Sequence, residues 1–215
     1  MIPMKRVITT SLSVSVATGL YGISFGALGV ASGLDIVSVM LLSLLMFSGA
    51  SQFAFIGVIA AGGAPLAAIA SAWLLGIRNS FYAIRLSSII PQSGLKRLLA
   101  AQLTIDESNA VSAAQQEPKN AIVGFWATGA GVYLFWNLAT LLGALAGDFM
   151  GDPSAWGLDA AAAAAFLGLL WPKLRERLLL ALAAAAVAFL LSPILPAGGA
   201  ILAAALVAVF PWGDK

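Results

Sequence analysis

The chain has 215 residues, of which 61% are hydrophobic and 9% are charged, and its formal net charge is +2. Soluble domains are about 45–50% apolar and about 25% charged, so this composition predicts an integral membrane protein and excludes a soluble enzyme and a nucleic-acid binder. The chain contains neither Cys nor His, which excludes disulfides, thiolate nucleophiles and Cys- or His-ligated metal sites. We therefore expect neither a metal nor a cofactor.

The apolar runs between the charges predict the membrane helices, since a helix needs about 20 apolar residues to cross a bilayer. Val7–Leu34 is long enough for one crossing, and Ile36–Ile77 for two, with a break at Gly62-Gly63-Ala64-Pro65. Further apolar runs follow at Ala121–Gly147, Leu158–Trp171, Leu178–Leu191 and Ala200–Phe210. The sequence thus predicts an all-α fold, a polytopic transmembrane helical bundle of about seven spans (six to eight), as a single domain over residues 1–215.

The orientation of these helices conflicts with the distribution of positive charge. Lys5, Arg6 and Lys96 should all be cytoplasmic, yet three crossings between Arg6 and Lys96 would place Lys96 outside. Three alternatives remain open at this level. Ile36–Ala61 re-enters the membrane without crossing it, the charge rule is broken here, or Leu95–Gln115 also crosses.

Two regions of the chain resemble each other. Gly33-Leu34-Asp35 and Gly157-Leu158-Asp159 each follow a glycine-rich segment and precede an apolar run. Internal repeats are common in transporters. The pattern is consistent with repeat halves at residues 7–115 and 120–213.

Five glycines recur at spacings that place them on one face of the first predicted helix. They are Gly19, Gly22, Gly26, Gly29 and Gly33. Small residues allow helix backbones to approach closely in lipid. The stripe therefore predicts a tight helix–helix contact, and a sliding surface or substrate wall is the functional alternative.

Small and polar residues interrupt the second apolar run at its midpoint. Ser48, Gly49, Ser51 and Gln52 lie where lipid would be deepest. Free backbone groups are tolerated at that depth only inside protein or beside a cavity, and transporters use broken helices to bind substrates. We expect a discontinuous helix near residues 48–52, whose second half starts near Gln52 and points its positive dipole end at a carboxylate. The alternative is close packing at Gly49 with Gln52 hydrogen-bonded to a neighbour.

Arg78 lies at the middle of the third predicted helix. An arginine at mid-membrane costs at least about 2.5–3.5 kcal/mol on insertion scales, so a compensating partner is expected. Asn79 follows it, and Tyr82 lies one turn away on the same face. A substrate-binding role and an internal ion pair with an aspartate both remain open, as do cavity-lining and helix-contact roles for Asn137 in a later helix.

A proton relay in a chain without histidine requires a carboxylate. The candidates are Asp35, Asp106 and Asp159. Asp35 and Asp159 lie near helix starts, where capping is the alternative. Asp106 lies in the amphipathic stretch Leu95–Gln115, for which a surface position is the alternative.

Three motifs resemble the AzlC family, the large subunits of branched-chain amino acid exporters. They are Gly22-Ile-Ser-Phe-Gly26, Phe47-Ser-Gly-Ala-Ser-Gln-Phe53 and Gly76-Ile-Arg-Asn-Ser-Phe-Tyr82. Thr104-Ile-Asp106-Glu107 is similar to the Thr-Asp-Glu motif of that family, with an isoleucine inserted. The family often has an Arg-His pair in the third-helix motif, and a coupling role for that His has no counterpart in this chain.

The resemblance implies a multi-pass protein of the inner cell membrane that exports valine, leucine and isoleucine, with methionine as a further candidate, by antiport against protons. It also implies a small AzlD-like membrane partner with about four spans. The residues themselves leave two other hypotheses open, a non-transporting assembly or sensor subunit and a passive channel for small neutral solutes. No lysine lies within a predicted span to support a Ser-Lys site, so we do not expect an enzyme.

Overall fold

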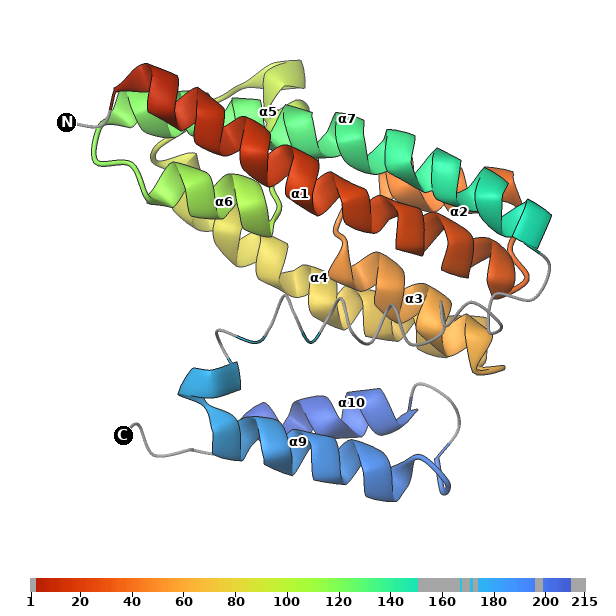
Figure 1. Ribbon diagram of the computed structural model, residues 1–215. Coiled ribbons are helices and arrows are strands. Elements are labelled where there is room, and N and C mark those ends of the chain that lie inside the picture. Colours follow the sequence, from red (N-terminus) through yellow and green to blue (C-terminus); the bar gives the residue numbers. More distant parts are fainter. Residues whose placement is uncertain (1–2, 151–166, 168–170, 172–173, 196–198, 210–215) are drawn as a thin grey trace.

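The computed structural model describes residues 3–150, 167, 171, 174–195 and 199–209. Every regular element in this part of the chain is a helix, which confirms the predicted all-α class (Figure 1). Two helices, α1 (Met4–Ala31) and α7 (Pro118–Met150), contain stretches long and apolar enough to cross a membrane. A third long helix is α4 (Pro65–Ser87). The number of crossings stays a prediction.

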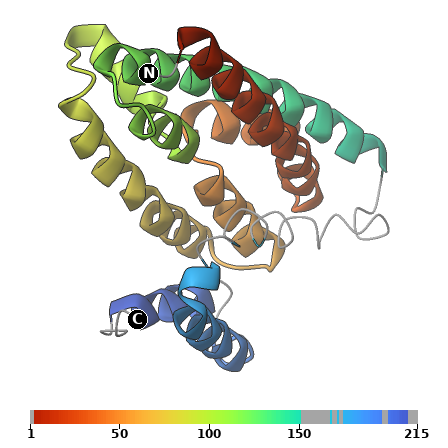
Figure 2. The same cartoon turned by 60° about the vertical axis from the view of Figure 1, so that its left-hand side comes forward.

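Helices α1 and α7 lie side by side and run in the same direction (Figures 1 and 2). Small residues line their contact. A Cβ atom on Gly22 would lie 2.5 Å from the carbonyl oxygen of Trp136, and a Cβ on Gly26 would overlap the backbone of Thr140. Gly19 packs against α7 in the same way. The glycines therefore allow two backbones to approach more closely than any side chain would permit.

The last two glycines of the predicted stripe have different environments. Gly29 packs against α2, where a Cβ would lie 2.7 Å from the Cγ2 atom of Val39. Gly33 has a φ of +90°, and no atom lies within 4 Å of a Cβ built there. The prediction that Gly33 belongs to the helix face is wrong, because α1 ends at Ala31 and Gly33 provides the left-handed residue of the turn that follows.

The apolar run after α1 forms two short helices, α2 (Ile36–Leu45) and α3 (Ala50–Ala60), and the predicted interruption lies between them. The C-terminal end of α2 lies beside the middle of α7, where the hydroxyl of Ser43 donates to that of Thr140 at 3.2 Å. The start of α3 lies beside the middle of α4, and α3 then returns to the end of the bundle where α4 begins (Figure 1). The pair α2–α3 therefore forms a hairpin whose tip lies in the middle of the bundle.

A second hairpin, α5 (Gly94–Gln102) and α6 (Asp106–Ala113), enters the bundle from the opposite end (Figure 1). Its tip reaches the tip of the first hairpin, where Gln102 Nε2 donates to the carbonyl of Leu44 at 2.8 Å. Helix α6 then returns to the start of α7. Leu95–Gln115 thus forms two short helices that fold back on each other, and whether this segment crosses the membrane or lies on its surface stays a prediction.

The two hairpins bring the positively charged helix starts together. The starts of α1, α5 and α7 all lie at one end of the bundle (Figure 1). Lys5 and Arg6 lie in the first turn of α1, Lys96 and Arg97 in the first turn of α5, and Lys119 in the first turn of α7. Positive charge gathered at one end is the pattern that the preference for a cytoplasmic face predicts.

Helices α1–α3 and α4–α6 form two similar units, each a long helix followed by a hairpin of two short helices (Figures 1 and 2). The long helices of the two units run in opposite directions. This relation differs from the predicted halves at residues 7–115 and 120–213, which stay a prediction. Gly157-Leu158-Asp159, on which those halves were based, lies outside the described residues. The chain continues with α9 (Leu178–Leu191), α10 (Gly199–Leu206) and a short 3-10 helix, η2 (Val207–Val209).

Candidate functional site

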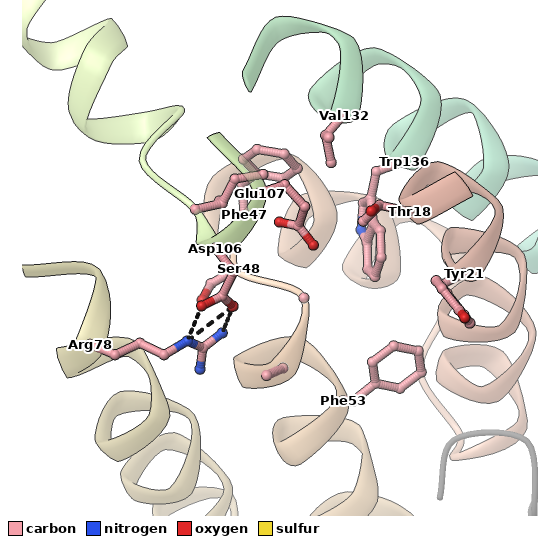
Figure 3. A pocket seen from close by; sticks show the side chains of 13 residues that line it. Thr18, Tyr21, Phe47, Ser48, Phe53, Arg78, Asp106, Glu107, Val132 and Trp136 are labelled. Atoms are coloured by element: carbon pink, nitrogen blue, oxygen red, sulfur yellow. Dashed lines mark hydrogen bonds and ion pairs between the residues drawn. The ribbon is translucent and has the colours of Figure 1, made fainter. Parts of the chain in front are cut away.

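A cavity lies where the tips of the two hairpins meet, between α1, α4 and α7 (Figure 3). The space between its lining atoms, together with open solvent at the mouth, is about 630 Å³. The lining residues are Thr18, Tyr21, Phe47, Ser48, Gly49, Ala50, Phe53, Arg78, Ile105, Asp106, Glu107, Val132 and Trp136. One side of the cavity is charged and the other is aromatic.

The charged side is centred on an ion pair between Arg78 of α4 and Asp106 at the start of α6. Arg78 Nη2 lies 2.8 Å from Asp106 Oδ2, and Nε lies 3.1 Å from the same oxygen. The remaining nitrogen, Nη1, donates to the carbonyl of Leu75 at 2.8 Å. Tyr82 donates its hydroxyl to Asp106 Oδ1 at 2.7 Å. Every nitrogen of the guanidinium group therefore has a protein acceptor, and the pair joins α4 to the second hairpin.

The polar residues at the break in the first hairpin bind one another and the adjacent helix. Asn79 Nδ2 donates to the Ser48 hydroxyl at 3.1 Å, and the hydroxyls of Ser48 and Ser51 lie 3.2 Å apart. Gln52 is fully buried and donates its Nε2 to the carbonyl of Leu42 at 3.0 Å. Gln52 thus satisfies a carbonyl at the end of α2, as the packing alternative predicts, and its side chain does not line the cavity.

The start of α3 offers backbone donors to the cavity. Helix α3 begins at Ala50, two residues before the predicted start near Gln52. Gly49, which directly precedes α3, has a φ of +29° and is the N-cap residue of the helix. In the described part of the chain the N–H groups of Gly49 and Ala50 have no acceptor. Both residues line the cavity. The positive end of the α3 dipole is therefore available to an anionic group.

The opposite wall is aromatic. Phe53 packs edge-on against Trp136 with ring centroids 6.2 Å apart, and Phe25 lies behind both rings. Trp136 is only 4% exposed, and its Nε1–H has no acceptor among the residues that the structure describes. A buried N–H without a partner costs roughly 1–3 kcal/mol, so Trp136 is a donor that a ligand in this cavity would satisfy.

Several cavity residues were not among the predicted site residues. Thr18, Tyr21 and Trp136 are on the long helices α1 and α7, where an apolar pattern favours packing or interfacial roles. Glu107 directly follows Asp106 in the Thr-Ile-Asp-Glu motif. This position next to a predicted site residue was the sequence signal that could have identified Glu107 as a site residue. Figure 3 shows its carboxylate on the cavity side, turned away from the ion pair.

Other predicted residues lie away from the cavity. Asp35 is exposed and caps α2, accepting the N–H of Ser38 at 2.6 Å, which lowers the pKa of its carboxyl group. Asn137 is buried and donates to the carbonyl of Tyr133 on its own helix at 2.7 Å. Asp159 lies outside the described residues. Of the three predicted coupling carboxylates, the structure places Asp106 at the cavity and Asp35 at a helix end.

Comparisons with known proteins agree with this architecture of membrane-type helices. A protein of Archaeoglobus fulgidus described as an uncharacterized membrane protein is 36% identical over 158 residues, which cover 72% of this chain and 68% of that protein. No solved structure matches the chain. The model of the AzlC protein family matches residues 13–150, more than half of the chain and the whole of the cavity. The chain is therefore a membrane protein of the AzlC family.

Proposed function

We propose that the chain is a transporter subunit that exports branched-chain amino acids in exchange for protons. The observation that carries the proposal is the cavity at the meeting point of two re-entrant hairpins, with an ion pair on one side and an aromatic wall on the other. Charged residues are retained at membrane depth mainly for function. Many transporters contain two repeated units of opposite orientation, with helices that are broken near the middle of the membrane.

The cavity has complementary groups for an amino acid zwitterion. The substrate carboxylate would accept hydrogen bonds from the N–H groups of Gly49 and Ala50 and from Nε1–H of Trp136. Its ammonium group would face the acidic residues Asp106 and Glu107. In this arrangement Arg78 does not take the carboxylate, because its charge is already paired with Asp106; it positions Asp106 and the tip of the second hairpin.

The side-chain wall favours an aliphatic substrate. Phe47, Phe53 and Val132 line it with carbon, so a hydroxyl or amide on the substrate would lose its hydrogen bonds to water. An apolar wall discriminates poorly between aliphatic groups, since one methylene group is worth about 1–3 kcal/mol. We therefore propose a class of substrates, valine, leucine and isoleucine with methionine as a further member.

The partner and the location complete the proposal. We propose that the chain works in the inner cell membrane as a multi-pass protein together with a small AzlD-like subunit of about four spans. Membership of the AzlC family supports this part of the proposal. Arrays of exposed apolar side chains on α4, among them Leu66, Trp73 and Phe81, provide surface for lipid or for such a subunit.

Efflux from cells preloaded with labelled leucine and valine tests the proposal. The chain is expressed alone and with a candidate small partner, with and without a protonophore. The proposal predicts efflux that the protonophore abolishes and that requires the partner. Efflux that the protonophore leaves unchanged would instead support a passive channel, and no efflux despite confirmed membrane insertion would support an assembly or sensor subunit.

A further inference from the structure

We propose that Glu107 is the group that carries the exchanged proton, and that its carboxylate binds either this proton or the ammonium group of the substrate. The proposal rests on the transport function proposed above and assigns its coupling step to a residue outside the predicted set of Asp35, Asp106 and Asp159.

Asp106 and Asp35, the other candidate carboxylates that the structure describes, are unsuited to releasing and rebinding a proton during transport. Asp106 is held by two nitrogens of Arg78 and by the hydroxyl of Tyr82, so protonating it would leave a membrane-depth guanidinium group without its counter-charge. Asp35 is exposed and tied to the first turn of α2. Glu107 lines the cavity and forms no salt bridge with any residue in the described ranges.

The surroundings of Glu107 contain no charge that would hold it permanently in one state. Thr18 and Tyr21 of α1 and Val132 and Trp136 of α7 line the same cavity as Glu107. The charged groups among the described lining residues, apart from Glu107, are Arg78 of α4 and Asp106 of α6, and these neutralise each other. The lining thus carries one net negative charge when Glu107 is ionised and none when it is protonated.

A single proton or a single ammonium group neutralises this charge, so the two bind in competition. With the cavity open to the outside, Glu107 takes a proton from water as the substrate leaves. With the cavity open to the cytoplasm, the ammonium group of the next substrate pairs with the carboxylate, and the proton passes to cytoplasmic water. The ammonium group keeps its own protons throughout, so one proton enters for each amino acid exported.

Leucine binding to the purified complex of the full-length chain with its small partner tests this assignment. Tritiated leucine binding and proton release into weakly buffered solution are measured for the wild type, Glu107→Gln and Glu117→Gln, the last being the same change outside the cavity. We expect the wild type and Glu117→Gln to bind leucine more tightly as pH rises and to release one proton per leucine. Glu107→Gln should release none and bind at least about tenfold more weakly, without dependence on pH.

Two further measurements keep the outcomes distinct. Glu107→Asp, which retains a titrating carboxylate, should still release a proton, and its behaviour decides the question if Glu107→Gln fails to fold. Infrared difference spectra between acidic and alkaline protein, taken without substrate, should show a protonated carboxyl band that Glu107→Gln removes.

Proton release that is unchanged in Glu107→Gln would overturn the assignment and leave the transport function standing. Failure of the wild type to bind leucine would overturn the transport function. In that case loss of the infrared band in Glu107→Gln would still support Glu107 as the titrating group, and retention of the band would overturn it.

Discussion

Arg78 on α4 and Asp106 on α6 form an ion pair in which Nη2 and Oδ2 lie 2.8 Å apart, at the place where the second hairpin reaches the middle of the bundle. These residues are 28 positions apart in sequence. The pair compensates the arginine at membrane depth and fixes the hairpin tip that presents Glu107 to the cavity.

Removing one member of the ion pair should destabilise the protein more than removing both. Arg78→Ala or Asp106→Ala leaves one charge without a partner, at a cost of about 1–2 kcal/mol. This estimate is below that for a fully buried pair, because the side chains are 26% and 31% exposed. The double variant should be more stable than the sum of the single changes predicts. Thermal unfolding of all four proteins in one detergent measures the coupling, and strictly additive effects would argue against a stabilising pair.

Replacing Trp136 with Phe should separate binding from stability. Phe keeps an aromatic ring beside Phe53 and Phe25 and removes an N–H that has no acceptor in the described part of the chain. We expect leucine binding to weaken about tenfold and the free energy of unfolding to change by less than about 1 kcal/mol, because removal of the unpaired N–H offsets the loss of ring volume. Trp73→Phe is the control, since Trp73 is 74% exposed and away from the cavity. Unchanged leucine affinity in Trp136→Phe would remove its N–H from the site.

The contact between α1 and α7 should be sensitive to a single methyl group. In Gly26→Ala the new Cβ would overlap the backbone of Thr140, so the two helices must separate, and we expect a loss of about 1–3 kcal/mol. Gly57→Ala is the matched control because no atom lies within 4 Å of its Cβ position. The control should be neutral or slightly stabilising, since Ala favours a helix over Gly. Equal stability of the two variants would contradict the close contact.

Re-entry of both hairpins predicts which residues share a side of the membrane. The chain has no Cys, so single cysteines can be introduced at Lys5, Lys96 and Asp35 and labelled with an impermeant maleimide in oriented vesicles. Lys5→Cys and Lys96→Cys should be labelled from the same side, and Asp35→Cys from the other, because α1 separates the two ends (Figure 1). Labelling of Lys5→Cys and Lys96→Cys from opposite sides would show that one hairpin crosses completely.

Much of the site could be anticipated from the sequence because polar residues are expensive in an apolar run. The interruption near Ser48-Gly49 and the central position of Arg78 are both visible without coordinates. The pairing of Arg78 with Asp106 was left as one option, since nothing local to Arg78 identifies which carboxylate reaches it. The all-α class followed directly from composition.

The role of the stretch around Asp106 and Glu107 could not be predicted in the same way. An amphipathic segment has the same pattern whether it lies on a membrane surface or dips into a polar cavity between helices. Only the return of α6 toward the start of α7 brings Glu107 beside Trp136. The assignment of Gly33 to the helix face was wrong for a related reason. Gly33 lies four residues after Gly29, as a residue on the same helix face would, but α1 has already ended at Ala31.

The central claim is that an aliphatic amino acid leaves through this cavity in exchange for a proton. The most direct measurement is efflux of labelled leucine from proteoliposomes that contain the chain and its small partner, with and without an acidic exterior. The account predicts that an inward proton gradient accelerates leucine efflux and that a protonophore removes the acceleration. Leucine efflux at the same rate with and without the gradient would contradict it.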